Sequence, residues 1–217
     1  ALQKAVQSLE IGIDSLDGTR PSLLKAGYKS AADEGLSDEA LLKRLAIPSP
    51  ARLFETYCAV RRGLSIDTLN QASGMDCWFL QQLLDIAHLE KELKYIEPHS
   101  PDLPVLLRRA KQMGFADSAL ARYLSRREQT LLAADVRALR KKLGILPTFQ
   151  RVDTCAAEFE ANTPYLYSAY QQEDEAQPTD RKKVLILGGG PNRIGQGIEF
   201  DYCCCQAAFT LAGMDYE

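Results

Sequence analysis

The sequence predicts a mainly α-helical protein that is followed by the first strand and helix of an α/β domain. Apolar residues recur at helical spacing between residues 36 and 146. A continuous apolar run over 183–187 is typical of a strand buried on both faces of a parallel sheet. Glycines follow, and a second helical pattern covers 198–212. Because one parallel strand cannot form a sheet, we expect further strands beyond residue 217.

The composition is that of an ordinary globular protein. The chain has 217 residues, of which 46% are hydrophobic and 25% charged, and its formal net charge is -3. No apolar run approaches the roughly 18 residues that a membrane span needs. Residues 1–5 lack the basic-then-apolar order of a signal peptide. We therefore expect a cytoplasmic protein without a membrane partner.

The cysteines and histidines argue against a metal centre. None of the six cysteines forms a C-x-x-C pair, and the two histidines are His88 and His99. Three adjacent cysteines at 203–205 would point in three directions on a helix and cannot easily chelate one ion. We interpret the cysteines as small apolar residues in a reducing compartment, and His88 as a packed or surface residue.

Local signals mark the ends of the first helices. Residues 1–35 contain one short helical pattern, at 2–9, and then turn signals that are typical of a connector. Further along, Ser49 is expected to open a helix that ends at Gly63. Asp76 is expected to cap the helix that follows.

The most regular pattern predicts one helix over 125–144. Ser125 and Glu128 have the spacing of a capping box, and Gly144 is typical of a helix end. The leucines and valine that follow repeat at steps of three and four residues, which places them on one helix face. Including leucines from earlier helices, the predicted core contains Leu53, Leu83, Leu132, Val136, Leu139 and Leu143.

A glycine-led pattern occurs three times before an apolar position. The glycines are Gly35, Gly63 and Gly114, and the leucine six residues after each is Leu41, Leu69 or Leu120. A repeated helix-turn-helix unit is one interpretation. The unequal intervals favour the other, in which each glycine simply precedes the start of a helix.

The glycine-rich segment 188–197 is a candidate phosphate site, because glycines between a strand and a helix let backbone N–H groups approach an anion. Two departures argue against it. Arg193 stands where the dinucleotide fingerprint needs its third glycine, and Gln196 stands where a P-loop needs lysine. A tight turn with close helix packing is therefore favoured. Arg193 and Glu199 remain as charged candidates at the carboxyl end of the strand.

A basic segment is the other candidate site. Residues 104–151 contain eleven Lys or Arg and three acids, which invites a nucleic-acid-binding interpretation. The alternative is a set of solvated helix faces, balanced by the seven acids of 152–180. The sequence pI near 5.6 and the absence of interleaved aromatics favour the alternative. We expect Trp78 and Phe79 to lie in the core and not to form a base-stacking platform.

Three motifs resemble one known family. They are RVDTCAAEF at 151–159, TPY at 163–165 and GGGPNRIGQGIEFDYC at 188–203. Together they closely resemble the middle of the large subunit of carbamoyl-phosphate synthetases. The likeness covers the whole chain and is looser over 13–146.

The resemblance implies an order of domains. Residues 1–12 would end the first synthetase half, and a linker over 13–35 would lead to a helical oligomerisation domain. A connector and the truncated start of the second, carbamoyl-phosphate half would follow. That start belongs to a Rossmann-like α/β domain that precedes the ATP-grasp fold. The helical domain is expected over 36–150, the connector over 151–182 and the start of the second half over 183–217.

The resemblance also implies a function. The parent would be an ATP-dependent ligase that makes carbamoyl phosphate from ATP, bicarbonate and glutamine-derived ammonia, for arginine or pyrimidine biosynthesis. Its partners would be a glutaminase subunit or domain and further copies of itself, and its cofactors ATP and Mg²⁺, with Mn²⁺ or K⁺ as further candidate ions. This segment would contain no catalytic, cofactor-binding or metal-binding residue and would not bind nucleic acid. It would contribute part of a carbamate tunnel wall through Arg193, Gly197 and Glu199.

Two rivals remain open at this point. One is a stand-alone helical module that binds nucleic acid through 104–151, and the other is a regulatory adaptor that has borrowed the helical domain. Both predict that residues 183–217 are dispensable, whereas the synthetase interpretation requires them to continue into a sheet.

Overall fold

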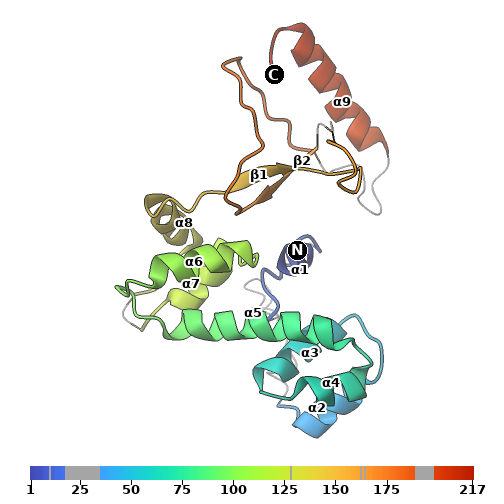
Figure 1. Cartoon of the computed structure of the whole chain (residues 1–217), viewed down its shortest axis with the longest axis vertical. Helices are drawn as coiled ribbons and strands as arrows, with labels where there is room; N and C mark the ends of the chain where they lie inside the picture. The colour runs from blue at the N-terminus through green and yellow to red at the C-terminus, as the bar shows by residue number, and fades with distance from the viewer. Residues whose placement is uncertain (10, 18–34, 128, 162, 164, 189–197) are drawn as a thin grey trace. The chain divides into compact units, whose positions relative to one another are not determined.

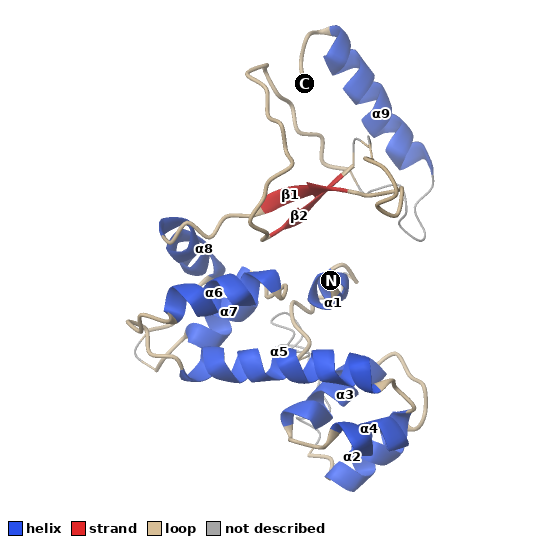
Figure 2. Ribbon diagram, in the orientation of Figure 1, coloured by secondary structure: helices blue, strands red, loops and turns tan. Residues whose placement is uncertain are grey.

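Helices dominate the part of the chain that the structure describes. The structure is a computed structural model that describes residues 1–9, 11–17, 35–127, 129–161, 163, 165–188 and 198–217. The chain divides into two units, Ala1–Asp174 and Glu175–Glu217 (Figure 1). The expected mainly α class is confirmed (Figure 2).

The long helix α5 (Cys77–Tyr95) organises the first unit. Its 19 residues span about 28 Å at 1.5 Å per residue. Helices α3 (Arg52–Arg61) and α4 (Ile66–Ser73) pack against α5 near its beginning in Figure 1, and α2 (Asp38–Leu45) packs on both of them. Further along, α5 contacts α7 (Asp117–Leu124). The predicted cap of α5 is confirmed, because Asp76 Oδ1 accepts the N–H of Trp78 at 2.8 Å.

The other helices of this unit are shorter. They are α1 (Leu2–Gln7), α6 (Leu103–Gln112) and α8 (Ala133–Lys142), and α8 packs on α7. The helix expected near the N-terminus is therefore confirmed.

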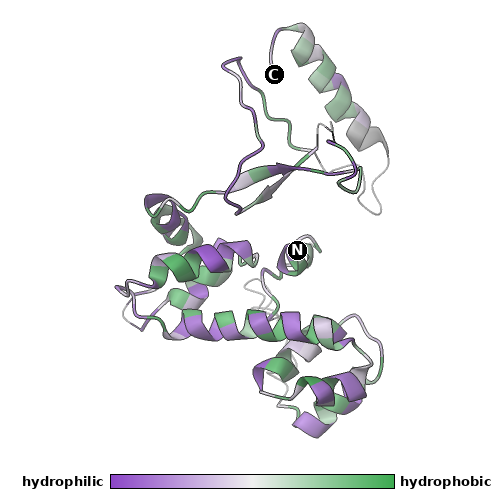
Figure 3. Cartoon of the chain, viewed as in Figure 1, coloured by the Kyte–Doolittle hydropathy of each residue, from purple (hydrophilic) through white to green (hydrophobic). Residues whose placement is uncertain are grey.

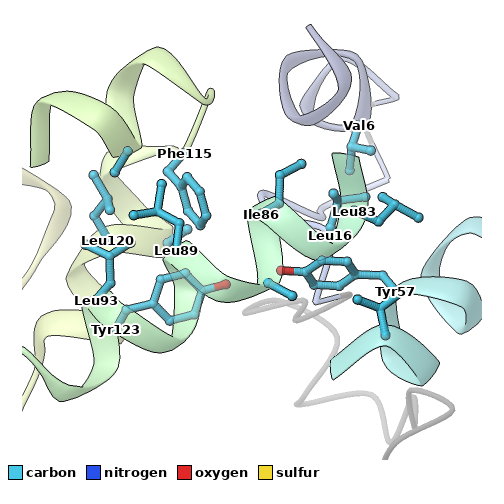
Figure 4. Packing of buried hydrophobic residues seen from close by; sticks show 14 of the residues in the cluster. Val6, Leu16, Tyr57, Leu83, Ile86, Leu89, Leu93, Phe115, Leu120 and Tyr123 are labelled. Carbon is cyan, nitrogen blue, oxygen red and sulfur yellow. The ribbon is translucent and has the colours of Figure 1, made fainter. Parts of the chain in front are cut away.

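The core lies on more than one face of α5. Apolar and polar residues alternate along this helix (Figure 3), as expected where part of each turn faces solvent. Its residues contribute to two groups within one buried cluster (Figure 4). Leu89 and Leu93 lie with Phe115, Leu120 and Tyr123, whereas Leu83 and Ile86 lie with Val6, Leu16 and Tyr57.

The glycine-led pattern marks the starts of helices. Gly63 and Gly114 have φ values of 89° and 86°, in the left-handed region that glycine adopts without strain. Ser37 and Ser65, two residues after a glycine, each accept a backbone N–H at the N-terminus of α2 or α4. The three leucines of the pattern, Leu41, Leu69 and Leu120, are fully buried.

The region expected to form one helix over 125–144 is helical only from Ala133 to Lys142. Helix α7 ends at Leu124 and α8 begins at Ala133. The Ser125 hydroxyl accepts the N–H of Leu131 at 2.9 Å, so it stabilises the turn after α7. The helix predicted to begin at Ser125 was therefore wrong.

A different carboxylate caps α8. Asp135 accepts the N–H of Leu132 at 2.8 Å. Leu132 is 66% exposed, so its placement in the core was wrong: it precedes the helix and does not belong to its apolar stripe. Glu128, the expected capping partner, lies outside the described residues. The remaining core predictions are confirmed as buried residues (Leu83, Val136) or as residues partly buried against the core (Leu53, Leu139, Leu143).

A β-hairpin follows the helices. Strands β1 (Thr148–Arg151) and β2 (Leu166–Ala169) pair antiparallel, with Thr148 opposite Ala169. Much of the hairpin falls in the segment expected to be a connector. Each strand has four residues, too few for an alternating apolar pattern to stand out in the sequence.

The second unit contains α9 (Ile198–Gly213), which confirms the helix expected over 198–212. The strand expected over 183–187 is not formed: among the described residues no neighbouring strand pairs with this segment. Leu185 and Leu187 are 85% and 88% exposed, so the expected burial was also wrong. The physical reason is that a parallel strand needs a partner strand to satisfy its N–H and C=O groups.

Candidate functional site

The glycine-rich loop is only partly described. Arg193 and Gly197 lie outside the described residues, and so does the side chain of Glu199, whose backbone begins α9. At the near end of the loop, a Cβ added to Gly188 would lie 2.8 Å from Cys204 Sγ on α9. This glycine therefore allows close approach of the chain to the helix, as the turn interpretation expects.

A first cluster of charges joins the segment 11–17 to α7. Arg122 donates to both carboxylate oxygens of Asp14, at 2.6 and 2.8 Å, and to Ser15 Oγ at 2.9 Å. Tyr123 Oη donates to Asp17 at 2.9 Å. Ile13 and Leu16 are buried beside these polar groups. Residues expected to begin a linker thus pack firmly on the helical region.

Arg122 changes the acidity of its partner. Burial raises the pKa of Asp14, but hydrogen bonds from Arg122 and Ser118 and the charge of Arg122 outweigh it and hold the pKa below the ordinary 3.8. A carboxyl group with a lowered pKa in the folded state stabilises the fold above its unfolded pKa. This stabilisation is lost as the pH falls through the folded value.

We expect Asp14→Asn to lower the free energy of unfolding at pH 7 by about 1–3 kcal/mol, because it leaves the half-buried Arg122 without its carboxylate. Below about pH 4 the free energy of unfolding of the variant should also fall less steeply as the pH decreases, because the carboxyl group with the lowered pKa has been removed. Urea unfolding at several pH values measures both effects. The control is Asp38→Asn, because Asp38 is an exposed partner of Arg62 at 3.0 Å. Identical pH profiles for the two variants would contradict the prediction.

A second cluster holds the hairpin. Asp117 forms ion pairs with Lys111 at 2.8 Å and with Arg140 at 2.9 Å. Both cations also lie near the ring of Tyr170, the residue that follows β2. The ring centre is 5.3 Å from Lys111 Nζ and 5.9 Å from Arg140 Cζ. Burial opposes ionisation of Asp117, but hydrogen bonds from both cations lower its pKa. Gln112 donates to the carbonyl of Tyr170 at 3.2 Å.

Helix α1 contacts both the helical region and the hairpin. Gln3 and Gln7 donate to the carbonyls of Met113 and Gly114 at 3.0 and 3.1 Å. Lys4 donates to the carbonyl of Ser168 on β2. The start of the chain and the hairpin, about 160 residues later, therefore lie side by side.

A third cluster is buried inside the helical region. Glu90 accepts the hydroxyl of Tyr57 at 2.8 Å and pairs with Arg61 at 3.1 Å. Burial, and then the charge of Glu90, raises the pKa of Tyr57, so its hydroxyl stays protonated and donates. This cluster connects α3 to α5.

These contacts bear on the sequence-based candidates. Several residues of the basic segment pair with acids of the same chain, including Lys111, Arg122 and Arg140. Trp78 and Phe79, in the first turn of α5, are exposed, so their placement in the core was wrong: the described residues leave most of each ring uncovered. His88 is exposed on α5, as one of the two alternatives allowed.

Neither a metal-binding cluster nor a membrane-spanning helix is found among the described residues. There, no group of three or more His, Cys, Asp or Glu side chains could hold a metal ion. The helices described include none long and apolar enough to cross a membrane.

The comparisons with known proteins agree with the resemblance. The model of the carbamoyl-phosphate synthetase large chain oligomerisation domain matches residues 1–144, and that of the carbamoyl phosphate synthase preATP-grasp domain matches 180–217. The arginine-specific, chloroplastic large chain of Oryza sativa subsp. japonica is 44% identical. The match covers the whole of the present chain and 17% of the rice protein. The large chains of Brucella melitensis biotype 1 and Archaeoglobus fulgidus are 43% and 40% identical, with 18% and 19% of their lengths covered.

The chain thus spans less than a fifth of the relatives that it matches, and it matches them from its first residue to its last. A helical region is followed by the beginning of an α/β unit in the order of the two matched domains. The chain belongs to the carbamoyl-phosphate synthetase large chain family.

Proposed function

We propose that the chain is the central part of a large subunit of glutamine-dependent carbamoyl-phosphate synthetase, an ATP-dependent ligase. The observation that carries this proposal is the succession of the two matched domains within one chain, the oligomerisation domain first and the pre-ATP-grasp domain second. The parent would make carbamoyl phosphate from ATP, bicarbonate and glutamine-derived ammonia. The curated relatives are named for this synthase.

In this proposal the chain is a joint between two synthetase halves. Residues 1–12 end the first half, 36–150 form the helical domain and 183–217 begin the second half. The charge clusters support a mechanical role, since they fix α1, the segment 11–17 and the hairpin on one helical core. A rigid core of this kind holds what precedes it at a defined position.

The second unit supports the same interpretation. Besides Leu185 and Leu187, large apolar side chains of α9 such as Tyr202 and Phe209 are exposed. Figure 3 shows few strongly polar residues along this helix. A helix that is apolar on most sides is normally covered by further protein, and the remaining strands of an α/β domain would cover it.

The loop after residue 187 is proposed as tunnel wall. Arg193, Gly197 and Glu199 match the family positions that line the path of carbamate between the active sites. A small residue keeps such a path open, and the two charged side chains would interact with an anionic intermediate. Arg193 and Gln196 replace the residues that phosphate-binding motifs need, which fits a conduit better than a nucleotide site.

The identity proposed for the full-length subunit also implies its binding partners and its metabolic pathway. We propose a glutaminase subunit or domain as partner, self-association through the helical domain, and a cytoplasmic location. The arginine-specific name of the rice relative favours arginine biosynthesis, with pyrimidine biosynthesis as the alternative. ATP and its metal ions would bind in the synthetase halves, because the described residues include neither a metal cluster nor a phosphate-binding lysine motif.

We expect the purified 217-residue chain neither to hydrolyse ATP nor to form carbamoyl phosphate. Phosphoryl transfer needs Mg²⁺-bound phosphates held in place, and in this proposal the parts that hold them belong to the rest of the two synthetase halves. Phosphate release with and without Mg²⁺ measures this, with the full-length subunit as positive control. Saturable, Mg²⁺-dependent turnover by the short chain would contradict the prediction. A parallel titration with duplex DNA tests the rival module, which requires specific binding that weakens steeply with salt.

A further inference from the structure

An apolar groove lies beside α1 in the first unit. It has a volume of about 750 Å³ and is lined by α1, by the first turns of α5 and by Leu53, Met75 and Met113. Two of its side chains are the aromatic rings of Trp78 and Phe79, which meet edge to face at 5.0 Å and are 62% and 61% exposed. Exposed aromatic residues that line an apolar groove are typical of a protein-binding surface.

One wall of this groove is firmly fixed. Val6 of α1 is buried, and the hydrogen bonds of Gln3 and Gln7 anchor the helix to the end of α6. Held in this way, α1 lines the groove with Ala1, Leu2, Gln3 and Ala5. The path of any preceding polypeptide therefore begins at the groove itself.

We propose that the groove, with Trp78 and Phe79 as anchors, is the docking site of the segment that immediately precedes Ala1 in the longer subunit. This inference rests on the proposed function, which places the chain inside a subunit of which it spans less than a fifth. A segment joined directly to Ala1 would reach the groove at an effective concentration on the order of millimolar or more, with little loss of entropy. A few apolar side chains suffice to fill it.

The size of the groove favours this occupant over a second copy of the chain. A stable interface between two proteins buries about 800 Å² on each partner, whereas a cavity of about 750 Å³ accepts a handful of side chains. Among the described residues up to 146, the other exposed large apolar side chains do not line the groove. They are Leu9, Ile11, Ile47, Tyr95, Val105, Leu132 and Leu146.

Hydroxyl-radical footprinting with mass spectrometry tests the proposal. The oxidation rates of Trp78 and Phe79 are compared between the 217-residue chain and the full-length subunit. Both rings should react readily in the short chain, and their rates should fall on the order of tenfold in the full-length subunit, because anchors of an interface are desolvated. Tyr95, exposed at the other end of α5, is the internal reference and should keep its rate.

The other outcomes overturn the proposal. Equal rates for Trp78 in the two proteins would show that the preceding segment does not cover the groove. Protection in the short chain that grows with protein concentration, together with dimers in sedimentation, would identify a second copy as the occupant. Protection in the monomeric short chain would show that the groove is already covered. Carbamoyl phosphate synthesis by the same full-length preparation tests the proposed function separately.

Discussion

Glu90→Ala is expected to lower the free energy of unfolding of the helical region by about 1–3 kcal/mol. Glu90 is almost fully buried and accepts the Tyr57 hydroxyl at 2.8 Å while pairing with Arg61 at 3.1 Å. Alanine would leave the buried Tyr57 hydroxyl without its acceptor, would remove the ion pair with the partly exposed Arg61, and would open a cavity between α3 and α5. Urea unfolding of the 217-residue chain, followed by circular dichroism, measures the change.

Glu92→Ala is the matched control. Glu92 lies two residues further along the same helix and pairs with Arg109 at 3.1 Å, but both side chains are about half exposed. Exposed ion pairs typically contribute less than about 1 kcal/mol. Similar shifts for the two variants would mean that the buried cluster does not stabilise the connection between α3 and α5.

Local signals in the sequence predicted the helices best. The cap at Asp76 and the turn at Gly63 depend on neighbours within a few residues, so the sequence contains all that determines them. The predicted start at Ser125 was wrong because Ser125 and Glu128 have the spacing of a capping box, whereas the Ser125 hydroxyl accepts the N–H of Leu131 in a turn. The side chain of a serine can stabilise a turn as well as a helix start, and its spacing to a glutamate does not distinguish the two.

Long-range features were not predictable. Lys4 meets Ser168, and Asp14 meets Arg122, across more than one hundred residues, and a single sequence gives no signal for such pairs. The exposure of Trp78 depends on which segments pack over the first turn of α5, and a single sequence does not give this packing. The family, by contrast, was evident from the loop motif over 188–203 before any contact was known.

In the full-length subunit, Gly197→Trp is expected to reduce glutamine-dependent carbamoyl phosphate synthesis on the order of tenfold or more. In the proposed tunnel an indole ring at position 197 would obstruct the path, and carbamate is too unstable to reach the second site through solvent. The catalytic groups at each ATP site are untouched, so each site should keep its own partial reaction. Glu199→Gln, which removes a charge at nearly constant volume, should show the same uncoupling to a smaller extent.

The measurement that tests the account most directly compares three rates in one preparation of each variant. They are bicarbonate-dependent ATP hydrolysis at the first site, ATP formation from ADP and carbamoyl phosphate at the second site, and glutamine-dependent synthesis overall. A joint that contributes tunnel wall predicts that both partial reactions persist in Gly197→Trp and Glu199→Gln while overall synthesis falls. A parallel loss of overall synthesis and of the second-site reaction would contradict it, because the loop would then only support the fold of the second half.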